Sequence, residues 1–314
     1  MLRSGLLGVF LLLTLPACQQ LTSEQAVFMW QSPLYQDHAL TGRILHTASG
    51  QFVTEAELTM AISRAHFLLL GEKHDNPDHH QLQKMLLARL YNQQQVASVS
   101  VEMLDASTDP QLQELLPRSV ANLDELRSAL DWDEEGWDWS FYGPILLDAV
   151  QQQVPLRSAN LTAAEVGEVY GQLLEPHIEA ALDAQAMEQL KAEIDRSHCN
   201  MLPASQFPAM VRVQQSRDYR MAQSLASEAP PQGQLRVLLA GNFHVRRDLG
   251  VPNYMPLVSP ETDSEQVLAL AFLEVAPGEE VAMNYLEAFS DVTPFDYVWF
   301  TPAVTSEDYC AAFQ

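Results

Sequence analysis

The chain has 314 residues, and 41 Asp and Glu against 17 Lys and Arg give it a net charge of −24. Its length and its 47% hydrophobic content are sufficient for one large domain with its own core. The strong negative charge argues against nucleic acid as a partner, because such a surface repels phosphate backbones.

The N-terminus predicts export. Arg3 precedes the apolar stretch "GLLGVFLLLTL", which is too short to span a bilayer comfortably and ends in "LPAC". This pattern predicts a lipoprotein signal peptide over 1–17, acylation of Cys18 and a tether over 18–35, so that acyl chains hold the domain at a membrane. An ordinary signal peptide with an incidental cysteine is the alternative. Gln19, rather than Asp, after the cysteine indicates an outer-membrane location facing the periplasm.

Further along the chain, apolar runs alternate with helical patterns. "TEAELTMAISRA" (54–65) has a capping box and predicts a helix, and Asn76 with Pro77 predicts the start of another. Strands are predicted over 66–72, 97–104, 154–161, 234–244, 266–275 and 295–302. The alternation predicts an α/β domain over 36–314, with a mostly parallel β-sheet flanked by helices and a smaller helical subdomain inserted at about 162–230.

Polar residues stand where several predicted strands end. They are Glu72, His74, Glu102, Asn160 and His244. The carboxyl ends of parallel strands share one edge, where ligands bind in such sheets. We therefore expect these five residues to share a site at this edge.

The stretches "LLLGEKH" and "LLAGNFH" share the pattern of an apolar strand, a glycine, two residues and a histidine. The glycines are expected to permit tight turns that bring His74 and His244 into one crevice. With the two glutamates they could bind a divalent metal, serve as general acid and base, or simply hold the crevice together. Of the adjacent His79 and His80, one is expected to line the crevice and the other to face solvent.

The segment "GNFHVRRDLGVPNYM" (241–255) carries two further candidates. Arg246 could bind ligand carboxylates, or it could pair with Asp248. Tyr254 could ligate a ferric haem iron, or it could pack at the edge of the core.

Two cysteines remain once Cys18 is set aside. Cys199 and Cys310 form an even pair in an exported chain, which predicts a disulfide, with two separate buried thiols as the alternative.

Several longer motifs occur together: "GEKHDNPDHHQLQ", "VEML", "GWDWSFYGPIL", "SHCNMLP", "RDYRMA", "AGNFHVRRDLGVPNYM" and "FDYVWFTP". In this order they resemble the ChaN-like haem-binding lipoproteins. The resemblance implies haem as cofactor, a role in haem and iron uptake, a homodimer around haem and an outer-membrane haem receptor as partner. It also implies a tyrosine ligand to the iron, which is carried over to Tyr254, with His244 and Arg246 as partners of the propionates and Tyr219 as a competing ligand.

The same motifs resemble a wider group of erythromycin-esterase-like and TIKI-type hydrolases. That resemblance implies an alternative function, an esterase or protease that depends on a divalent metal such as Mn, Co or Zn. Glu72, His74, Glu102 and His244 would be its catalytic residues and metal ligands. We favour a haem-binding protein over an enzyme.

Overall fold

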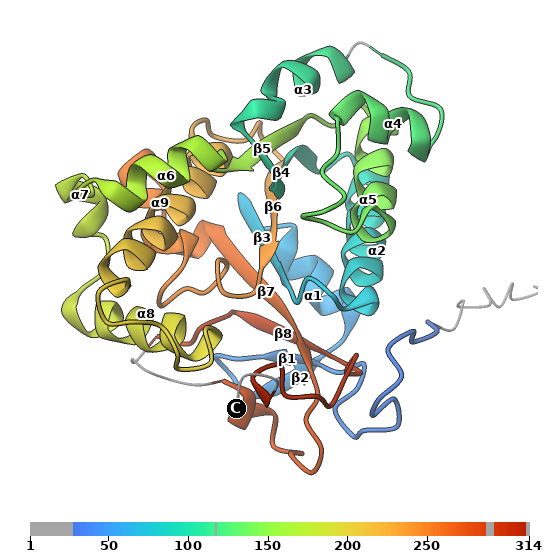
Figure 1. The fold of residues 1–314 in the computed structure, drawn as a ribbon. Coiled ribbons are helices and arrows are strands. Elements are labelled where there is room, and N and C mark those ends of the chain that lie inside the picture. Colours follow the sequence, from blue (N-terminus) through green and yellow to red (C-terminus); the bar gives the residue numbers. More distant parts are fainter. Residues whose placement is uncertain (1–27, 117, 287–291, 312–314) are drawn as a thin grey trace, which may run out of the picture.

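The computed structural model describes residues 28–116, 118–286 and 292–311. The predicted signal peptide, Cys18 and most of the predicted tether lie outside these residues. Eight strands form one sheet in the order β2-β1-β8-β7-β3-β6-β4-β5 (Figure 1). The strands are β1 (Ile44–His46), β2 (Gln51–Val53), β3 (Phe67–Glu72), β4 (Val96–Asp105), β5 (Leu156–Asn160), β6 (Leu235–Gly241), β7 (Val267–Glu274) and β8 (Tyr297–Thr301).

Helices cover both faces of this sheet. They are α1 (Glu55–Ile62), α2 (Pro77–Asn92), α3 (Asp109–Leu115), α4 (Leu123–Leu130), α5 (Trp139–Gln151), α6 (Ala163–Gly171), α7 (Pro176–Glu179), α8 (Ala184–Ser197), α9 (Phe207–Ala226) and α10 (Met255–Val258). Figure 1 shows α2, α4 and α5 on one side and α6 to α9 on the other. No helix among the described residues is long and apolar enough to cross a membrane.

Strand β3 lies in the middle of the sheet and is buried along its whole length. Its side chains alternate between two hydrophobic clusters: Leu68 and Leu70 join the one that includes α2 and α5, and Phe67 and Leu69 join the one that includes α9. A strand covered on both faces needs the continuous apolar run that the sequence shows there. The predicted α/β fold with a mostly parallel sheet is confirmed.

The predicted helix starts are also confirmed. Thr54 and Glu57 form the capping box of α1. The side chain of Asn76 accepts the backbone N–H of Asp78 at 2.9 Å, and Pro77 occupies the first position of α2. The cap fixes where the chain leaves β3, and so positions the residues between the two elements.

Two parts of the chain differ from expectation. The sequence did not predict β1 and β2, which pair antiparallel at one end of the sheet, with β1 also antiparallel to β8. The end of the predicted tether packs against the domain, since the backbone N–H groups of Gln31 and Ser32 donate to the Asp78 carboxylate at 2.8 and 2.9 Å. Helices α6 to α9 run between β5 and β6, where the sequence predicts the helical insertion.

Candidate functional site

The carboxyl ends of β3, β6 and β4 lie side by side. The strands are parallel, and Glu72 of β3 is in register with Gly241 of β6. Glu102 reaches the same place from β4, because its Oε2 accepts the backbone N–H of Gly241 at 2.7 Å. The predicted convergence of Glu72, Glu102 and the residues after β6 at one edge of the sheet is therefore present.

The two glycines of the repeated pattern are required by close packing. A Cβ at Gly71 would lie 2.4 Å from Val245 Cγ2 and 2.6 Å from Asn242 Oδ1. A Cβ at Gly241 would lie 3.0 Å from Nε2 of His74. The expectation that these glycines permit tight turns is wrong, because neither residue has a positive φ. Each is needed because a side chain there would collide with residues of the other G-x-x-H stretch.

Glu72 is a buried carboxylate with three partners. His74 Nδ1 lies 3.0 Å from Oε1, the Tyr142 hydroxyl donates to Oε1 at 2.8 Å, and His80 Nε2 lies 2.9 Å from Oε2. Burial alone would raise the pKa of Glu72, but the charge of His80 and the hydrogen bonds from both histidines lower that pKa to about 2. Glu72 thus places a carboxylate directly behind the ring of His74.

His244 is clamped between two carboxylates. Its Nδ1 lies 2.6 Å from Asp218 Oδ1, and its Nε2 lies 3.3 Å from Glu102 Oε1. Burial would lower the pKa of His244, yet the charges of Glu102 and Asp218 raise it to about 10. The pKa of Glu102 falls to about 2, because His244 outweighs the effect of burial. Burial raises the pKa of Asp218, although the charge of His244 and its hydrogen bond oppose that rise.

His74 is the accessible member of the cluster. Its side chain is 43% exposed, and the ring of Trp137 meets it edge-on at 4.9 Å between centroids. Burial lowers the pKa of His74, but the hydrogen bond to Glu72 and the charges of Glu102 and Glu72 raise it overall. Nδ1 faces Glu72, and Nε2 lies beside Gly241, where a Cβ would come within 3.0 Å of it.

The contacts of these histidines and carboxylates show how well they could bind a divalent metal. Imidazole and carboxylate groups suit several divalent metals. Both ring nitrogens of His244 face carboxylates, however, and Glu102 also accepts a backbone N–H. Within the described ranges, no three His, Cys, Asp or Glu side chains are arranged to hold a metal ion. As they stand, these residues form a charge-paired network. A metal at His244 would use Nε2, the nitrogen that faces Glu102, while Nδ1 stays on Asp218.

The expectation that either His79 or His80 faces solvent is wrong. Both are buried, because the start of α2 is enclosed by neighbouring elements. His79 Nδ1 accepts the backbone N–H of Lys73 at 2.8 Å, and its Nε2 lies 2.9 Å from Thr301 Oγ1 of β8. His80 stacks on Phe141 of α5 at 4.8 Å while it contacts Glu72.

The residues that the resemblance assigns to haem differ in how far they are buried. Tyr254 is fully buried in the cluster that includes α9, and burial raises its pKa, which disfavours the phenolate. Arg246 is bound to Asp248 through two contacts of 2.9 and 2.6 Å, and is also 3.7 Å from Glu193. Tyr219 is only partly buried on α9, with its ring 5.7 Å from that of His177.

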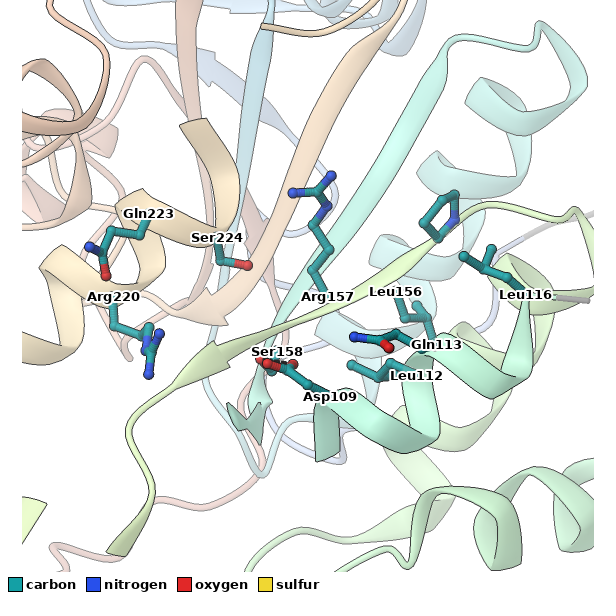
Figure 2. A pocket seen from close by; sticks show the side chains of 11 residues that line it. Asp109, Leu112, Gln113, Leu116, Leu156, Arg157, Ser158, Arg220, Gln223 and Ser224 are labelled. Atoms are coloured by element: carbon teal, nitrogen blue, oxygen red, sulfur yellow. Dashed lines mark hydrogen bonds between the residues drawn. The ribbon is translucent and has the colours of Figure 1, made fainter. Parts of the chain in front are cut away.

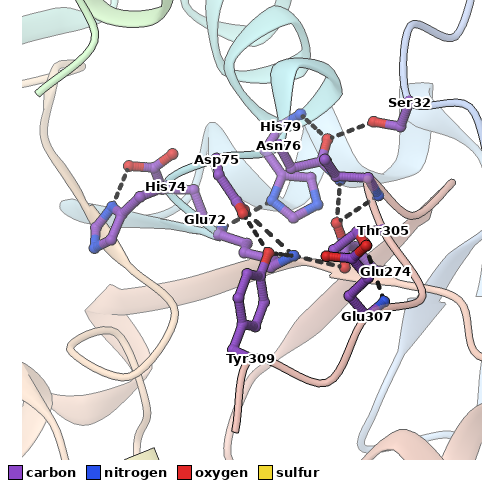
Figure 3. A network of polar contacts seen from close by, with 12 residues as sticks. Ser32, Glu72, His74, Asp75, Asn76, His79, Glu274, Thr305, Glu307 and Tyr309 are labelled. Carbon is purple, nitrogen blue, oxygen red and sulfur yellow. Dashed lines mark hydrogen bonds and ion pairs between the residues drawn. The ribbon is translucent and has the colours of Figure 1, made fainter. Parts of the chain in front are cut away.

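A polar network joins the rim of the site to the C-terminus (Figure 3). Lys73 Nζ lies 3.1 Å from Glu274 and 3.3 Å from Asp75, and the Tyr309 hydroxyl donates to Asp75 at 2.6 Å. The next residue, Cys310, forms the predicted disulfide with Cys199, just after α8. The disulfide therefore ties the loop after β3, the C-terminal segment and α8 together.

A separate cavity of about 600 Å³ opens along the edge strand β5, between α3 and α9 (Figure 2). Its cations are already paired, since Arg157 lies 3.3 Å from Glu228 and Arg220 lies 2.7 Å from Glu165. None of the predicted site residues lines it. The cavity is therefore a different place from the His–carboxylate cluster, which consists of Glu72, His74, Glu102, Asp218 and His244.

Four residues of the cluster were not predicted: His80 as a partner of Glu72, Tyr142, Asp218 and Gln214. The Gln214 amide nitrogen lies 3.4 Å from Asp218 and 3.1 Å from His244. The signal for the last two was present, because polar residues four apart share one face of a helix, and α9 buries this face.

Comparison with known proteins places these features in a family. A family model described as "Haem-binding uptake, Tiki superfamily, ChaN" matches residues 58–255. A solved structure described as cofacial heme binding to ChaN of Campylobacter jejuni is 24% identical, covers 82% of this chain and 95% of its own, and has a TM-score of 0.67. A mutant erythromycin esterase, EreC, in its open conformation is 15% identical over 81% of this chain and 95% of its own, with a TM-score of 0.46. No curated protein matches the chain.

Proposed function

We propose that the chain, which belongs to the family of haem-binding uptake proteins of the Tiki superfamily that includes ChaN, binds haem and takes part in haem uptake or handling. The observation that carries the proposal is the family match, which spans more than half of the chain and includes β3, the His–carboxylate cluster and all of α9. The protein supplies the binding site and the ligand that sets the state of the iron.

We propose that a tyrosine ligates the iron, and the exposures favour Tyr219 over Tyr254. A phenolate must meet the iron directly, and Tyr219 reaches the surface of α9, whereas Tyr254 is fully enclosed. His244 and Arg246, the expected partners of the propionates, are both committed to buried carboxylates. Because Tyr254 is fully enclosed against α9, ligation of iron by Tyr254 would need α10 to move away from α9.

The test is haemin titration of the chain lacking residues 1–18, a truncation that removes no described residue, followed by absorbance. A saturable high-spin ferric spectrum that is lost in Tyr219→Phe and kept in Tyr254→Phe is the expected result. Loss in Tyr254→Phe alone would overturn the choice of ligand while it supported haem binding. A titration that never saturates would overturn haem binding itself.

Acylation of Cys18, an outer-membrane location facing the periplasm, a homodimer around haem and an outer-membrane haem receptor are further parts of this proposal. Their support is the N-terminal pattern and the family. The full chain is expected in the outer-membrane fraction, and Cys18→Ser is expected to release it. Sedimentation of the truncated chain with and without haemin tests the dimer.

A second function, hydrolysis of an ester or peptide, is favoured by one observation. Glu72, His74, Glu102 and His244 converge, and the side chain of His74 is 43% exposed while Glu72 orients its ring. A carboxylate behind an accessible imidazole is the arrangement of a general base. Activity on ester and peptide substrates that disappears in His74→Ala would support it. The metal-dependent form requires bound Mn, Co or Zn that is lost in Glu102→Gln, and elemental analysis decides this.

A further inference from the structure

A cavity of about 510 Å³ lies within the helical insertion, between α8 and α9, and the segment that leads into α7, together with Glu179 of α7, forms another wall. Volumes of this size are typical of sites for small molecules and cofactors. Its lining residues are Leu173, Leu174, Glu179, Met187, Lys191, Ala204, Phe207, Pro208, Val211, Arg212 and Gln215. None of the residues of the His–carboxylate cluster lines this cavity.

The walls of the cavity are largely apolar. Leu174, Met187, Phe207 and Val211 supply aliphatic and aromatic surface from α8, α9 and the segment before α7. Leu173 at its edge is 95% exposed. Exposing a large aliphatic side chain beside an open apolar cavity is unfavourable unless something covers both.

Two cations lie among these apolar residues, although the whole chain has few. Among the described residues, Lys191 of α8 pairs with Glu188 alone, one turn back on the same exposed helix face, and such pairs are weak. Arg212 of α9 uses Nε and one terminal nitrogen to bind the carbonyls of Val169 and Tyr170, at 3.2 and 2.7 Å. A guanidinium has five N–H donors, so it has donors left for a carboxylate.

We propose that this cavity seats the ring of an iron porphyrin, with Lys191 and Arg212 receiving its carboxylates. The inference rests on the proposed haem-binding function and gives it a location. A flat apolar ring with two carboxylates matches apolar walls that carry two cations. Glu179, the acidic member of the lining, orients the ring by repelling the carboxylates from its own side.

The cavity also lies near the proposed iron ligand. Gln215 lines it, and Tyr219 follows Gln215 by four residues on α9, so both lie on the same face of the helix. The Gln215 amide donates to the carbonyl of Ile178 at 3.3 Å, which fixes α7 over this face. The seat and the ligand can therefore be tested separately.

The experiment titrates the chain lacking residues 1–18 with metal-free protoporphyrin, followed by fluorescence, and with haemin, followed by absorbance. The metal-free ring needs the seat but no iron ligand. Lys191→Glu and Leu173→Glu are each expected to weaken binding of both rings about tenfold or more. Tyr219→Phe is expected to change the haemin spectrum and leave binding of the metal-free ring nearly unaltered.

Two matched variants serve as controls. Lys84→Glu makes the same charge change on α2, and Leu116→Glu makes the same side-chain change at the cavity along β5. Both are expected to bind as the unmodified chain does. Equal weakening in each variant and its control, or weakening in Leu116→Glu alone, would overturn the seat while haem binding stood. Absence of saturable haemin binding by the unmodified chain would instead overturn the proposed function.

Discussion

Nδ1 of His244 lies 2.6 Å from Oδ1 of Asp218, so a buried ion pair ties the turn after β6 to the middle of α9. The other ring nitrogen faces Glu102 of β4 at 3.3 Å. One imidazolium therefore joins the sheet to the helical insertion. Removing one partner of a buried pair costs more than the pair itself contributes, because the remaining charge stays buried.

Replacing Asp218 with Asn tests this link. The amide keeps the shape and one hydrogen bond but removes the charge, so the pKa of His244 is expected to fall from about 10. The free energy of unfolding is expected to drop by about 1–3 kcal/mol. Imidazole titration by NMR and urea unfolding measure the two effects. Asp37→Asn, at an exposed position, is the control with the same charge change. An unchanged His244 pKa in Asp218→Asn would contradict the role of the pair.

Stability is expected to depend on pH in a direction that these groups determine. The pKa of His244 is higher in the folded protein, so its contribution is complete below about pH 6.5 and is lost as the pH rises towards 10. The pKa values of Glu72 and Glu102 are lower when folded, so their contribution is complete above about pH 4.5 and is lost as the pH falls towards 2. Urea unfolding should therefore show a maximum between about pH 4.5 and 6.5. A midpoint that rises from pH 6.5 to 9 would contradict this, and His244→Gln should flatten the alkaline side.

Much of the architecture was predictable because it is encoded locally. Capping residues mark where α1 and α2 begin, and unbroken apolar runs mark strands that are covered on both faces. Parallel strands bring their carboxyl ends to one edge, so the convergence of Glu72, Glu102 and His244 also followed from the sequence.

The remaining features depend on packing between distant elements. The strands β1 and β2 have three residues each and carry no clear apolar alternation, so only their pairing with each other and with β8 identifies them. Tyr142 reaches the site from α5, a helix whose rotation about its axis no local pattern determines. The burial of Tyr254 has the same origin, because its segment folds back onto α9. The sequence could propose it as a ligand but could not show that it is enclosed.

The two glycines of the repeated motif are expected to respond differently to Ala. At Gly71 the new methyl would meet Val245 and the backbone of Asn242 inside the core, and overpacking of this kind costs about 1–3 kcal/mol. At Gly241 it would meet the ring of His74, which is partly exposed and can swing away. Gly241→Ala should therefore change stability little but lower the pKa of His74 by separating it from Glu72. Urea unfolding and NMR titration compare the two variants, and a larger loss of stability in Gly241→Ala would contradict the argument.

The disulfide between Cys199 and Cys310 is expected to be a major part of the stability, because it closes a loop across 111 residues. The chain-entropy model gives an upper figure of about 4–5 kcal/mol for a loop of this length. The Cys199→Ser, Cys310→Ser double variant should lose up to this amount in urea unfolding. Because Cys310 follows Tyr309, the variant should also loosen the contact of Tyr309 with Asp75 and make the C-terminal segment easier for a protease to cleave. Tyr309→Phe is the matched variant that removes this hydrogen bond and keeps the disulfide. If the double variant unfolds at the same urea concentration as the oxidised chain, the disulfide does not contribute to stability in this way.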